Sequence, residues 1–173
     1  MIAPTNKPSH VQHEHLSFLI LDAPNDTNLP LYIKEFKKYQ VTDIVRACEP
    51  TYSRSTVETA GFKLHEMEFP DGEPPSGEII NQWLDLVETT FKDNAKQNAG
   101  NNTNDKTIAV HCVAGLGRAP VLVAIALIEN GLDVINAVEH IRQSRRGAIN
   151  LRQLKYLEKY QPIRKDKGKC SIM

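Results

Sequence analysis

His-Cys-Val-Ala-Gly-Leu-Gly-Arg, at residues 111–118, is the segment around which the rest of this chain can be arranged. The apolar residues 107–110 before it predict a buried strand. The apolar residues 119–128 after it, with Pro120 in the first turn, predict a helix. A cysteine therefore leaves a strand, glycines turn the chain, and an arginine opens a helix. This arrangement aims backbone N–H groups and a helix N-terminus at one point, which suits a bound dianion.

The interval between Cys112 and Arg118 predicts a loop that holds a phosphate group. The positive field of such a loop favours the thiolate form of Cys112, which is the nucleophilic form. The planar guanidinium of Arg118 can bind two phosphate oxygens. The expected phosphate-binding residues are Val113, Ala114, Gly115, Leu116, Gly117 and Arg118. The alternative, a buried structural cysteine in a glycine-rich turn, gives no reason for an arginine at the helix start.

Composition narrows the class of protein. The chain has 173 residues, and its 21 Lys and Arg residues balance its 21 Asp and Glu residues, so nothing indicates a nucleic-acid partner. Cys48, Cys112 and Cys170 are odd in number and far apart, which argues against a disulfide framework or a zinc site and favours a reducing compartment. We therefore expect no metal and no cofactor. No signal peptide or membrane-spanning apolar run is expected either.

Strands and helices are predicted to alternate along the chain, which implies one α/β domain with a central, mostly parallel sheet and helices on both faces. The predicted strands are residues 16–21, 41–48, 62–69 and 107–110. The predicted helices are residues 29–39, 55–61, 76–91, 118–130, 134–141 and 150–157.

The expected organisation has three parts. Residues 1–14 are polar and aperiodic, so we expect a flexible N-terminal arm. Residues 15–163 form the domain, and the asparagine-rich residues 93–106 form a polar insertion in it. Residues 164–173 form a basic tail. The insertion could bind a partner or could simply be solvated.

The tail ends in Cys170-Ser171-Ile172-Met173, which matches the C-a-a-X prenylation box, and the terminal methionine predicts farnesyl on Cys170. One lipid chain binds a membrane only marginally. The basic tail residues can supply the second signal at roughly 1 kcal/mol each on an anionic leaflet; they are Arg164, Lys165, Lys167 and Lys169. A chance C-terminal cysteine is the alternative.

Five segments carry a resemblance to a known family: residues 45–49, 71–75, 111–120, 141–148 and 157–160. They are similar to the phosphatases of regenerating liver, the prenylated group of small dual-specificity-like protein tyrosine phosphatases. Ala119 before Pro120 is the most distinctive detail, because most relatives have serine or threonine at position 119. The N-terminal arm and the asparagine-rich insertion depart from the family pattern.

The resemblance implies a cysteine-dependent phosphatase fold, with Cys112 as nucleophile, Arg118 as phosphate clamp and Asp71 as general acid on a loop that closes over the site. It also implies a reversible disulfide between Cys48 and Cys112 under oxidation. From the residues alone, a small buried hydrophobe is the favoured interpretation of Cys48. The arginines at positions 142, 145 and 146 could act on charged substrates or simply suit a helix C-terminus.

The expected activity is hydrolysis of phosphotyrosine through a phosphocysteine, at the cytoplasmic face of membranes with a cytosolic pool. We expect slow turnover, because Ala119 cannot donate a hydrogen bond to the departing thiolate. Two alternatives stay open: a phosphocysteine-regulated binding partner of cyclin M-type magnesium transporters, and a phosphoinositide phosphatase. The apolar Val113, Ala114 and Leu116 favour a phosphoprotein over a lipid. Self-association at the membrane is compatible with the resemblance.

Overall fold

A computed structural model describes residues 7–96 and 105–164 of the chain. Within them, five strands form one sheet in the order β1-β2-β5-β3-β4. The strands are β1 (Ser9–His13), β2 (Leu16–Leu21), β3 (Val41–Arg46), β4 (Lys63–Glu66) and β5 (Thr107–His111). Only the β1–β2 pair is antiparallel among them. The expected mostly parallel sheet is confirmed.

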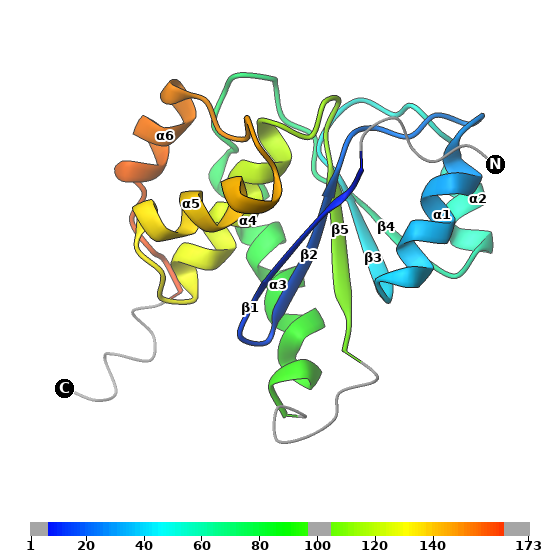
Figure 1. Cartoon of the computed structure of the whole chain (residues 1–173), viewed down its shortest axis with the longest axis horizontal. Helices are drawn as coiled ribbons and strands as arrows, with labels where there is room; N and C mark the ends of the chain where they lie inside the picture. Colours follow the sequence, from blue (N-terminus) through cyan, green and yellow to red (C-terminus); the bar gives the residue numbers. More distant parts are fainter. Residues whose placement is uncertain (1–6, 97–104, 165–173) are drawn as a thin grey trace.

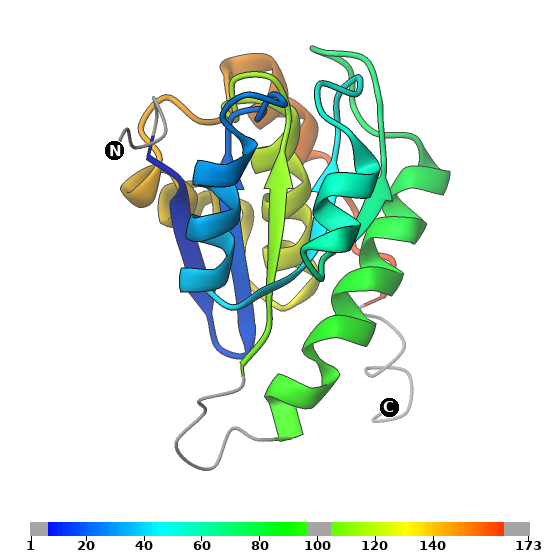
Figure 2. The ribbon, with the colours of Figure 1, turned by 90° about the vertical axis from the view of Figure 1, so that its right-hand side faces the viewer.

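Helices cover both faces of the sheet (Figures 1 and 2). One face carries α1 (Leu29–Lys38) and α2 (Arg54–Thr59). The other face carries α3 (Gly77–Lys96), α4 (Arg118–Glu129), α5 (Val134–Ser144) and α6 (Leu151–Glu158).

Alternation along the strands builds these two layers, because successive side chains of a strand point to opposite faces. In β2, Leu19 and Leu21 belong to the apolar cluster of α1, whereas Phe18 and Ile20 belong to the cluster of α3 and α4. All four side chains are fully buried. The sheet is therefore sandwiched between two hydrophobic layers.

Helix α4 is the centre of the larger layer, and its residues 118–128 are all buried. Its carbonyl at Leu122 accepts a hydrogen bond of 2.7 Å from the Trp83 indole of α3. A helix that is apolar all round must lie inside the protein. This burial fixes the first turn of α4, and with it Arg118, against the end of the sheet.

The carboxyl ends of the parallel strands meet at one edge, the upper edge in Figure 1. His111 at the end of β5 is in register with Leu21 of β2 and Arg46 of β3, and Arg46 is in register with Glu66 of β4. Loops that follow such strands converge, and in α/β proteins they form the functional site. Residues 112–118 leave the sheet at this edge.

Two boundaries differ from the sequence prediction. Ser9–His13, expected in a flexible arm, form the edge strand β1 and bury Val11. The polar insertion expected at residues 93–106 begins later, because α3 continues to Lys96. Asn94 is buried there, and its amide group donates to the carbonyl of His15 and exchanges hydrogen bonds with the backbone of Lys106. The expected prenylation site, Cys170, lies outside the described residues.

Among the helices of the described residues, none is both long enough and apolar enough to cross a bilayer.

Candidate active site

Cys112 lies at the bottom of a cavity of about 300 Å³ at the carboxyl edge of the sheet. Its side chain is almost fully buried, and its Sγ accepts a hydrogen bond from the backbone N–H of Ala119 at 3.5 Å. Most of the cavity wall is the loop of residues 112–118, which we call the phosphate loop. The sulfur therefore faces the N-terminus of α4.

The carbonyl groups of the phosphate loop are turned away from the cavity. Four consecutive carbonyls, at residues 113–116, accept hydrogen bonds from groups outside the loop. Their donors are Ala23 N, Arg145 Nη2, Arg145 Nε and Ile149 N, in that order. When the carbonyls of a curled segment point outward, its N–H groups point inward and form an anion-binding concavity. The predicted phosphate-binding residues are thus gathered around one point.

Arg118 contributes a buried cation to the same cavity. Its Nη1 donates to the carbonyl of Phe69 at 3.1 Å, which fixes the guanidinium plane. Its Nε is buried and has no hydrogen-bond partner among the described residues. Leaving a buried donor unpaired is costly, so an unpaired guanidinium N–H beside the nucleophile indicates where an anion binds.

Asp71 stands at the rim of the cavity, on the loop of residues 70–75, which we call the acid loop. One carboxylate oxygen lies 3.9 Å from Arg118 Nε, and 81% of the side chain is exposed. The loop begins where Phe69 N donates to the carbonyl of Ala47, and Gly72 turns it with a φ of 82°. The structure thus brings together all three predicted catalytic residues.

Gly115 is required by the packing of the phosphate loop. Its φ is 71°, and a Cβ at this position would lie 2.7 Å from the carbonyl oxygen of Leu21 and 2.5 Å from Arg145 Nη2. No side chain fits between the loop and β2 there.

Arg145 is the main external support of the phosphate loop. Besides the carbonyls of Ala114 and Gly115, it donates to the Ser9 hydroxyl at 3.1 Å and to the Lys7 carbonyl at 3.2 Å. Burial lowers the pKa of its guanidinium, and the charges of Asp22 and Cys112 oppose that shift. The other two arginines of this group do not hydrogen-bond to the phosphate loop. Arg146 is exposed, and Arg142 donates to the carbonyls of Ala148 and Ile149 instead.

Ile149 also supports the phosphate loop, and its backbone adopts a strained conformation to do so. Its N–H donates to the Leu116 carbonyl at 2.8 Å, and its φ is 65°. A β-branched residue with a positive φ is strained, and such strain is typical of functional sites.

His111 is fully buried behind the nucleophile. Its Nε2 lies 2.7 Å from the hydroxyl of Tyr52, and its Nδ1 lies 3.3 Å from the carbonyl of Cys112. Burial lowers the pKa of His111 to about 4 and raises the pKa of Tyr52 above its usual range. The neutral ring therefore donates through Nδ1 to Cys112 and accepts through Nε2 from Tyr52, which holds the Cys112 backbone in place.

Tyr52 is held in turn by Arg46. The guanidinium of Arg46 lies 4.7 Å from the Tyr52 ring centroid and donates to the Tyr52 carbonyl at 2.9 Å. Glu66 binds Arg46 through both carboxylate oxygens, with 2.8 Å at Nε. A chain of contacts thus runs from β4 to the nucleophile.

Cys48 is buried beside the same network, and its Sγ lies 3.9 Å from His111 Nδ1. Both Cys48 and Cys112 are free thiols in this structure. Burial raises the pKa of Cys48 to about 11, and the charge of Cys112 adds to the shift. The pairing of the two cysteines is not formed here and stays a prediction.

Gln153 is a site residue that sequence analysis did not identify. It lines the cavity together with Gly147 and Asn150. Its side chain also completes a capping box at the start of α6, where it accepts from Asn150 N at 2.9 Å. An Asn-x-x-Gln spacing is typical of a helix cap, but it carries no information about a cavity.

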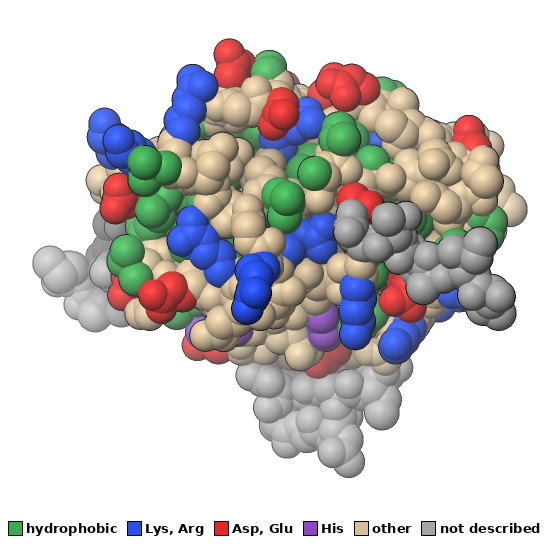
Figure 3. Space-filling view, turned by 45° about the horizontal axis from the view of Figure 1, so that its top comes forward, with side chains coloured by type: hydrophobic (Ala, Val, Ile, Leu, Met, Phe, Trp, Pro, Cys, Tyr) green, Lys and Arg blue, Asp and Glu red, His purple; other side chains and the backbone are tan. Residues whose placement is uncertain are grey.

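Two apolar side chains lie exposed at the mouth of the cavity. Val113 and Leu116 expose 54% and 40% of their surface, although both are hydrophobic. Figure 3 shows hydrophobic side chains on the face to which the strands' carboxyl ends lead, with lysine and arginine side chains beside them on the side of α5 and α6. No group of three His, Cys, Asp or Glu residues suited to a metal ion occurs within the described ranges. The buried Cys112, the inward N–H groups and the apolar side chains at the mouth suit nucleophilic attack on an anionic ester with an apolar group.

Comparisons with known proteins agree with this geometry. The model of the protein-tyrosine phosphatase family matches residues 28–161. Type IVA A protein tyrosine phosphatase of Dictyostelium discoideum is 49% identical over 97% of this chain and 95% of its own. Human protein tyrosine phosphatase type IVA 3 is 42% identical over 99% of this chain and 100% of its own. A solved protein tyrosine phosphatase from Leishmania major has a TM-score of 0.79 and 38% identity, over 90% of this chain and 99% of that one.

Proposed function

Because this chain belongs to the protein-tyrosine phosphatase family, in the type IVA group, we propose that it hydrolyses phosphotyrosine in proteins through a phosphocysteine at Cys112 and that the intermediate breaks down slowly. The observation that carries the proposal is the arrangement around the sulfur. Four outward carbonyls leave the loop N–H groups facing the cavity, and the buried Arg118 Nε has no hydrogen-bond partner among the described residues. Both features suit a phosphate ester directly above Cys112.

In the first step the Cys112 thiolate attacks phosphorus in line, and the bond from phosphorus to the tyrosyl oxygen breaks. The inward N–H groups and the Arg118 guanidinium stabilise the charge on the three equatorial oxygens. Asp71 donates its proton to the leaving phenolic oxygen. Its exposed position at the rim suits a group that must reach an oxygen at the cavity mouth.

In the second step water attacks the phosphocysteine, and Asp71, now a carboxylate, accepts a proton from it. The departing thiolate receives the hydrogen bond from Ala119 N but none from a side chain, because residue 119 is alanine and is fully buried. One missing donor at a developing charge can slow a step by ~10²–10³-fold. The phosphocysteine should therefore accumulate.

Intact-mass measurement during incubation with an aryl phosphate tests this function. We expect a species heavier by one phosphoryl group that persists after the substrate is removed. The Cys112→Ser variant should show neither steady turnover nor this species. Full activity of Cys112→Ser would refute the assignment of the nucleophile.

The apolar mouth supports a phosphoprotein as substrate, because Val113 and Leu116 can pack against an aryl ring and carry no charge for further phosphates. A phosphoinositide is the competing substrate. Release of phosphate from phosphotyrosine peptide and from phosphoinositide vesicles, measured side by side, distinguishes the two.

A long-lived phosphocysteine also supports the alternative role as a regulated binding partner of cyclin M-type magnesium transporters. In that role the phosphoryl group occupies the cavity and blocks docking. Capture of the transporter should then be weaker in any variant that keeps the phosphoryl group longer than the wild type does. Ala119→Ser, which should lose the phosphoryl group sooner, should capture more transporter than the wild type.

We also propose that farnesyl on Cys170 and the adjacent basic residues anchor the protein to the cytoplasmic face of membranes. The support is the C-terminal Cys-Ser-Ile-Met sequence. Cys170→Ser should move the protein from the membrane fraction to the cytosol in cells, and unchanged membrane association would contradict the anchor.

A reversible Cys48–Cys112 disulfide is proposed as protection against over-oxidation. Peroxide oxidises the Cys112 thiolate to a sulfenic acid, and the Cys48 thiol then forms the S–S bond with release of water. The raised pKa of Cys48 keeps it protonated, so Cys112 reacts with peroxide first. Mass spectrometry after mild peroxide should find the linked peptides. Sulfinic or sulfonic Cys112 without a linked form would contradict this proposal.

A further inference from the structure

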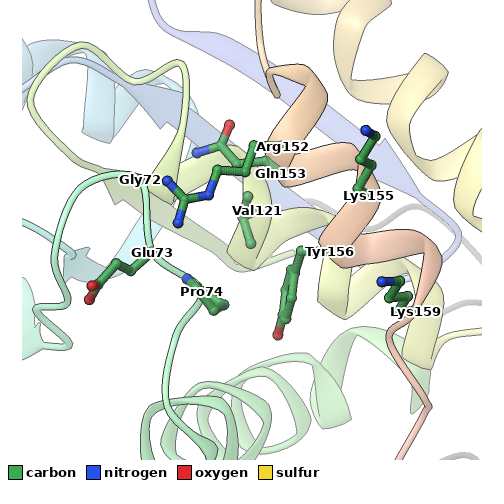
Figure 4. A pocket seen from close by; sticks show the side chains of 9 residues that line it. All are labelled: Gly72, Glu73, Pro74, Val121, Arg152, Gln153, Lys155, Tyr156 and Lys159. Carbon is green, nitrogen blue, oxygen red and sulfur yellow. The ribbon is translucent and has the colours of Figure 1, made fainter.

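A second cavity, of about 210 Å³, lies between the acid loop and α6 (Figure 4). We call it the α6 pocket. Gly72 and Pro74 of the acid loop form one side, Val121 of α4 forms the bottom, and Arg152 and Tyr156 of α6 form the other side.

The α6 pocket adjoins the catalytic cavity. Gln153 lines both cavities, and Asp71, at the rim of the catalytic cavity, is followed directly by Gly72 of the α6 pocket. In Figure 4, Arg152 extends from α6 toward Gly72 of the acid loop. A polypeptide whose phosphotyrosine enters the catalytic cavity can therefore reach this pocket with its neighbouring residues.

The lining of the α6 pocket carries an excess of positive charge. Arg152, Lys155 and Lys159 line it at positions that recur on one side of α6, and the only acidic residue in its lining is Glu73. Figure 4 shows Glu73 directed away from α6. Within residues 7–96 and 105–164, none of these three cations has an ion pair, whereas Arg46 has one and Arg54 and Arg164 have two each. The three cations are available to an acidic ligand.

The bottom of the pocket is apolar. Val121 is buried, Pro74 and the ring of Tyr156 lie beside it, and burial raises the pKa of Tyr156 above its usual value. Apolar surface beneath a cationic rim complements a hydrophobic side chain that has an acidic neighbour.

We propose that the α6 pocket is a substrate-recognition subsite that binds a hydrophobic residue flanked by acidic residues near the phosphotyrosine. The proposal rests on the proposed phosphotyrosine phosphatase function and assigns its sequence preference to α6. The hydrophobic residue packs on Val121 and Tyr156, and the acidic residues pair with Arg152 and Lys159 at the rim.

Three phosphotyrosine peptides test the proposal. They differ only within four residues on both sides of the phosphotyrosine. The first carries leucine and glutamates at these positions, the second carries alanines, and the third carries leucine and lysines. Two partly exposed ion pairs should raise kcat/KM of the glutamate peptide over the alanine peptide by roughly tenfold. The lysine peptide should be the poorest substrate.

The double variant Arg152→Ala/Lys159→Ala should reduce the glutamate peptide to the level of the alanine peptide. Turnover of a small aryl phosphate should stay within about twofold, because that substrate does not reach the α6 pocket. Lys37→Ala/Lys38→Ala is the matched control, since it removes two cations from the end of α1, on the opposite face of the sheet. The control should keep the full preference for glutamate.

Affinity for the same peptides in a Cys112→Ser background gives a readout that does not depend on turnover. Equal kcat/KM and equal affinity for the glutamate and alanine peptides would overturn the subsite, while aryl phosphate turnover would leave the proposed function standing. Loss of aryl phosphate turnover in the unmodified protein would instead refute the proposed function. If Arg152→Ala/Lys159→Ala lost binding to phosphoinositide vesicles but kept its peptide preference, the pocket would belong to lipid headgroups and the proposal would be wrong.

Discussion

The backbone N–H of residue 119 lies 3.5 Å from the sulfur of Cys112, the proposed nucleophile, so in the proposed mechanism the side chain of this residue decides whether the departing thiolate receives a second hydrogen bond. A serine here can donate a second hydrogen bond. Ala119→Ser should therefore speed breakdown of the phosphocysteine and raise turnover by up to about 10²-fold. Steady-state hydrolysis of an aryl phosphate, with intact-mass measurement of the phosphoenzyme, checks this expectation.

Ala137→Ser is the control for Ala119→Ser, because Ala137 is equally buried but lies in α5, away from the cavity. It should leave the life of the phosphoenzyme unchanged. An unchanged turnover in Ala119→Ser would contradict the explanation of slow breakdown.

The buried His111 makes stability depend on pH. Its pKa is about 4 in the folded protein, against about 6.5 in an unfolded chain. Between these values the folded state binds fewer protons than the unfolded state, so stability falls as the pH falls from 6.5 to 4. The loss from this one residue can reach about 3 kcal/mol.

Urea unfolding of the wild type and of His111→Gln, at pH 7.5, 5.5 and 4.5, measures this loss. The variant lacks the titrating ring, whereas the other acid-sensitive groups, such as Asp43 and Glu66, are common to both proteins. The stability advantage of the wild type should therefore shrink as the pH falls. A constant difference across this range would show that His111 does not titrate as described.

At the scale of elements, Arg145, directly after α5, maintains the conformation of the phosphate loop. Arg145→Ala would remove five hydrogen bonds and leave the carbonyls of Ala114 and Gly115 unpaired. We expect a loss of about 2–3 kcal/mol in the free energy of unfolding, together with weaker inhibition by inorganic phosphate. The exposed neighbour provides the comparison: Arg146→Ala should change neither quantity. Equal effects of the two substitutions would contradict the role of Arg145.

The sequence predicted most elements because their signals are local. Residues 107–128 carry a strand, a turn and an apolar helix in sequence order, and the Asn150 cap of α6 is a short-range pattern. That Cys112 and Arg118 share one cavity could be expected from phosphate chemistry, and that Asp71 lies at its rim could be expected from the resemblance.

What could not be predicted depends on contacts between distant segments. Arg145 meets Gly115 and Ser9 across 30 and 136 residues, and Tyr52 meets His111 across 59. Strand β1 has one fully buried hydrophobic residue, Val11, so its five residues look like a polar arm until β2 pairs with them. The place of Gln153 in the cavity could not be predicted, since it arises from how α6 packs.

At the scale of the whole molecule, β1 closes the edge of the sheet beside β2. A variant that lacks residues 1–13 would expose the polar backbone of β2 and lose the burial of Val11, worth about 2 kcal/mol. We expect a lower melting temperature and aggregation, measured by thermal denaturation and light scattering. A variant that lacks only residues 1–6 should behave as the wild type. Equal stability of the two truncations would show that β1 is dispensable.

The bond from Arg145 to the Lys7 carbonyl has a practical consequence for imaging the protein in cells. A fluorescent reporter placed after Met173 would block the prenylation box proposed above, so the other end of the chain is the better place for it. A bulky reporter fused directly to Lys7 would disturb the hydrogen bond from Arg145, which supports the phosphate loop. The labelled protein would then show the location of an enzyme with an altered site. Fused ahead of Met1, with the six intervening residues kept as a spacer, the reporter should leave that arginine undisturbed.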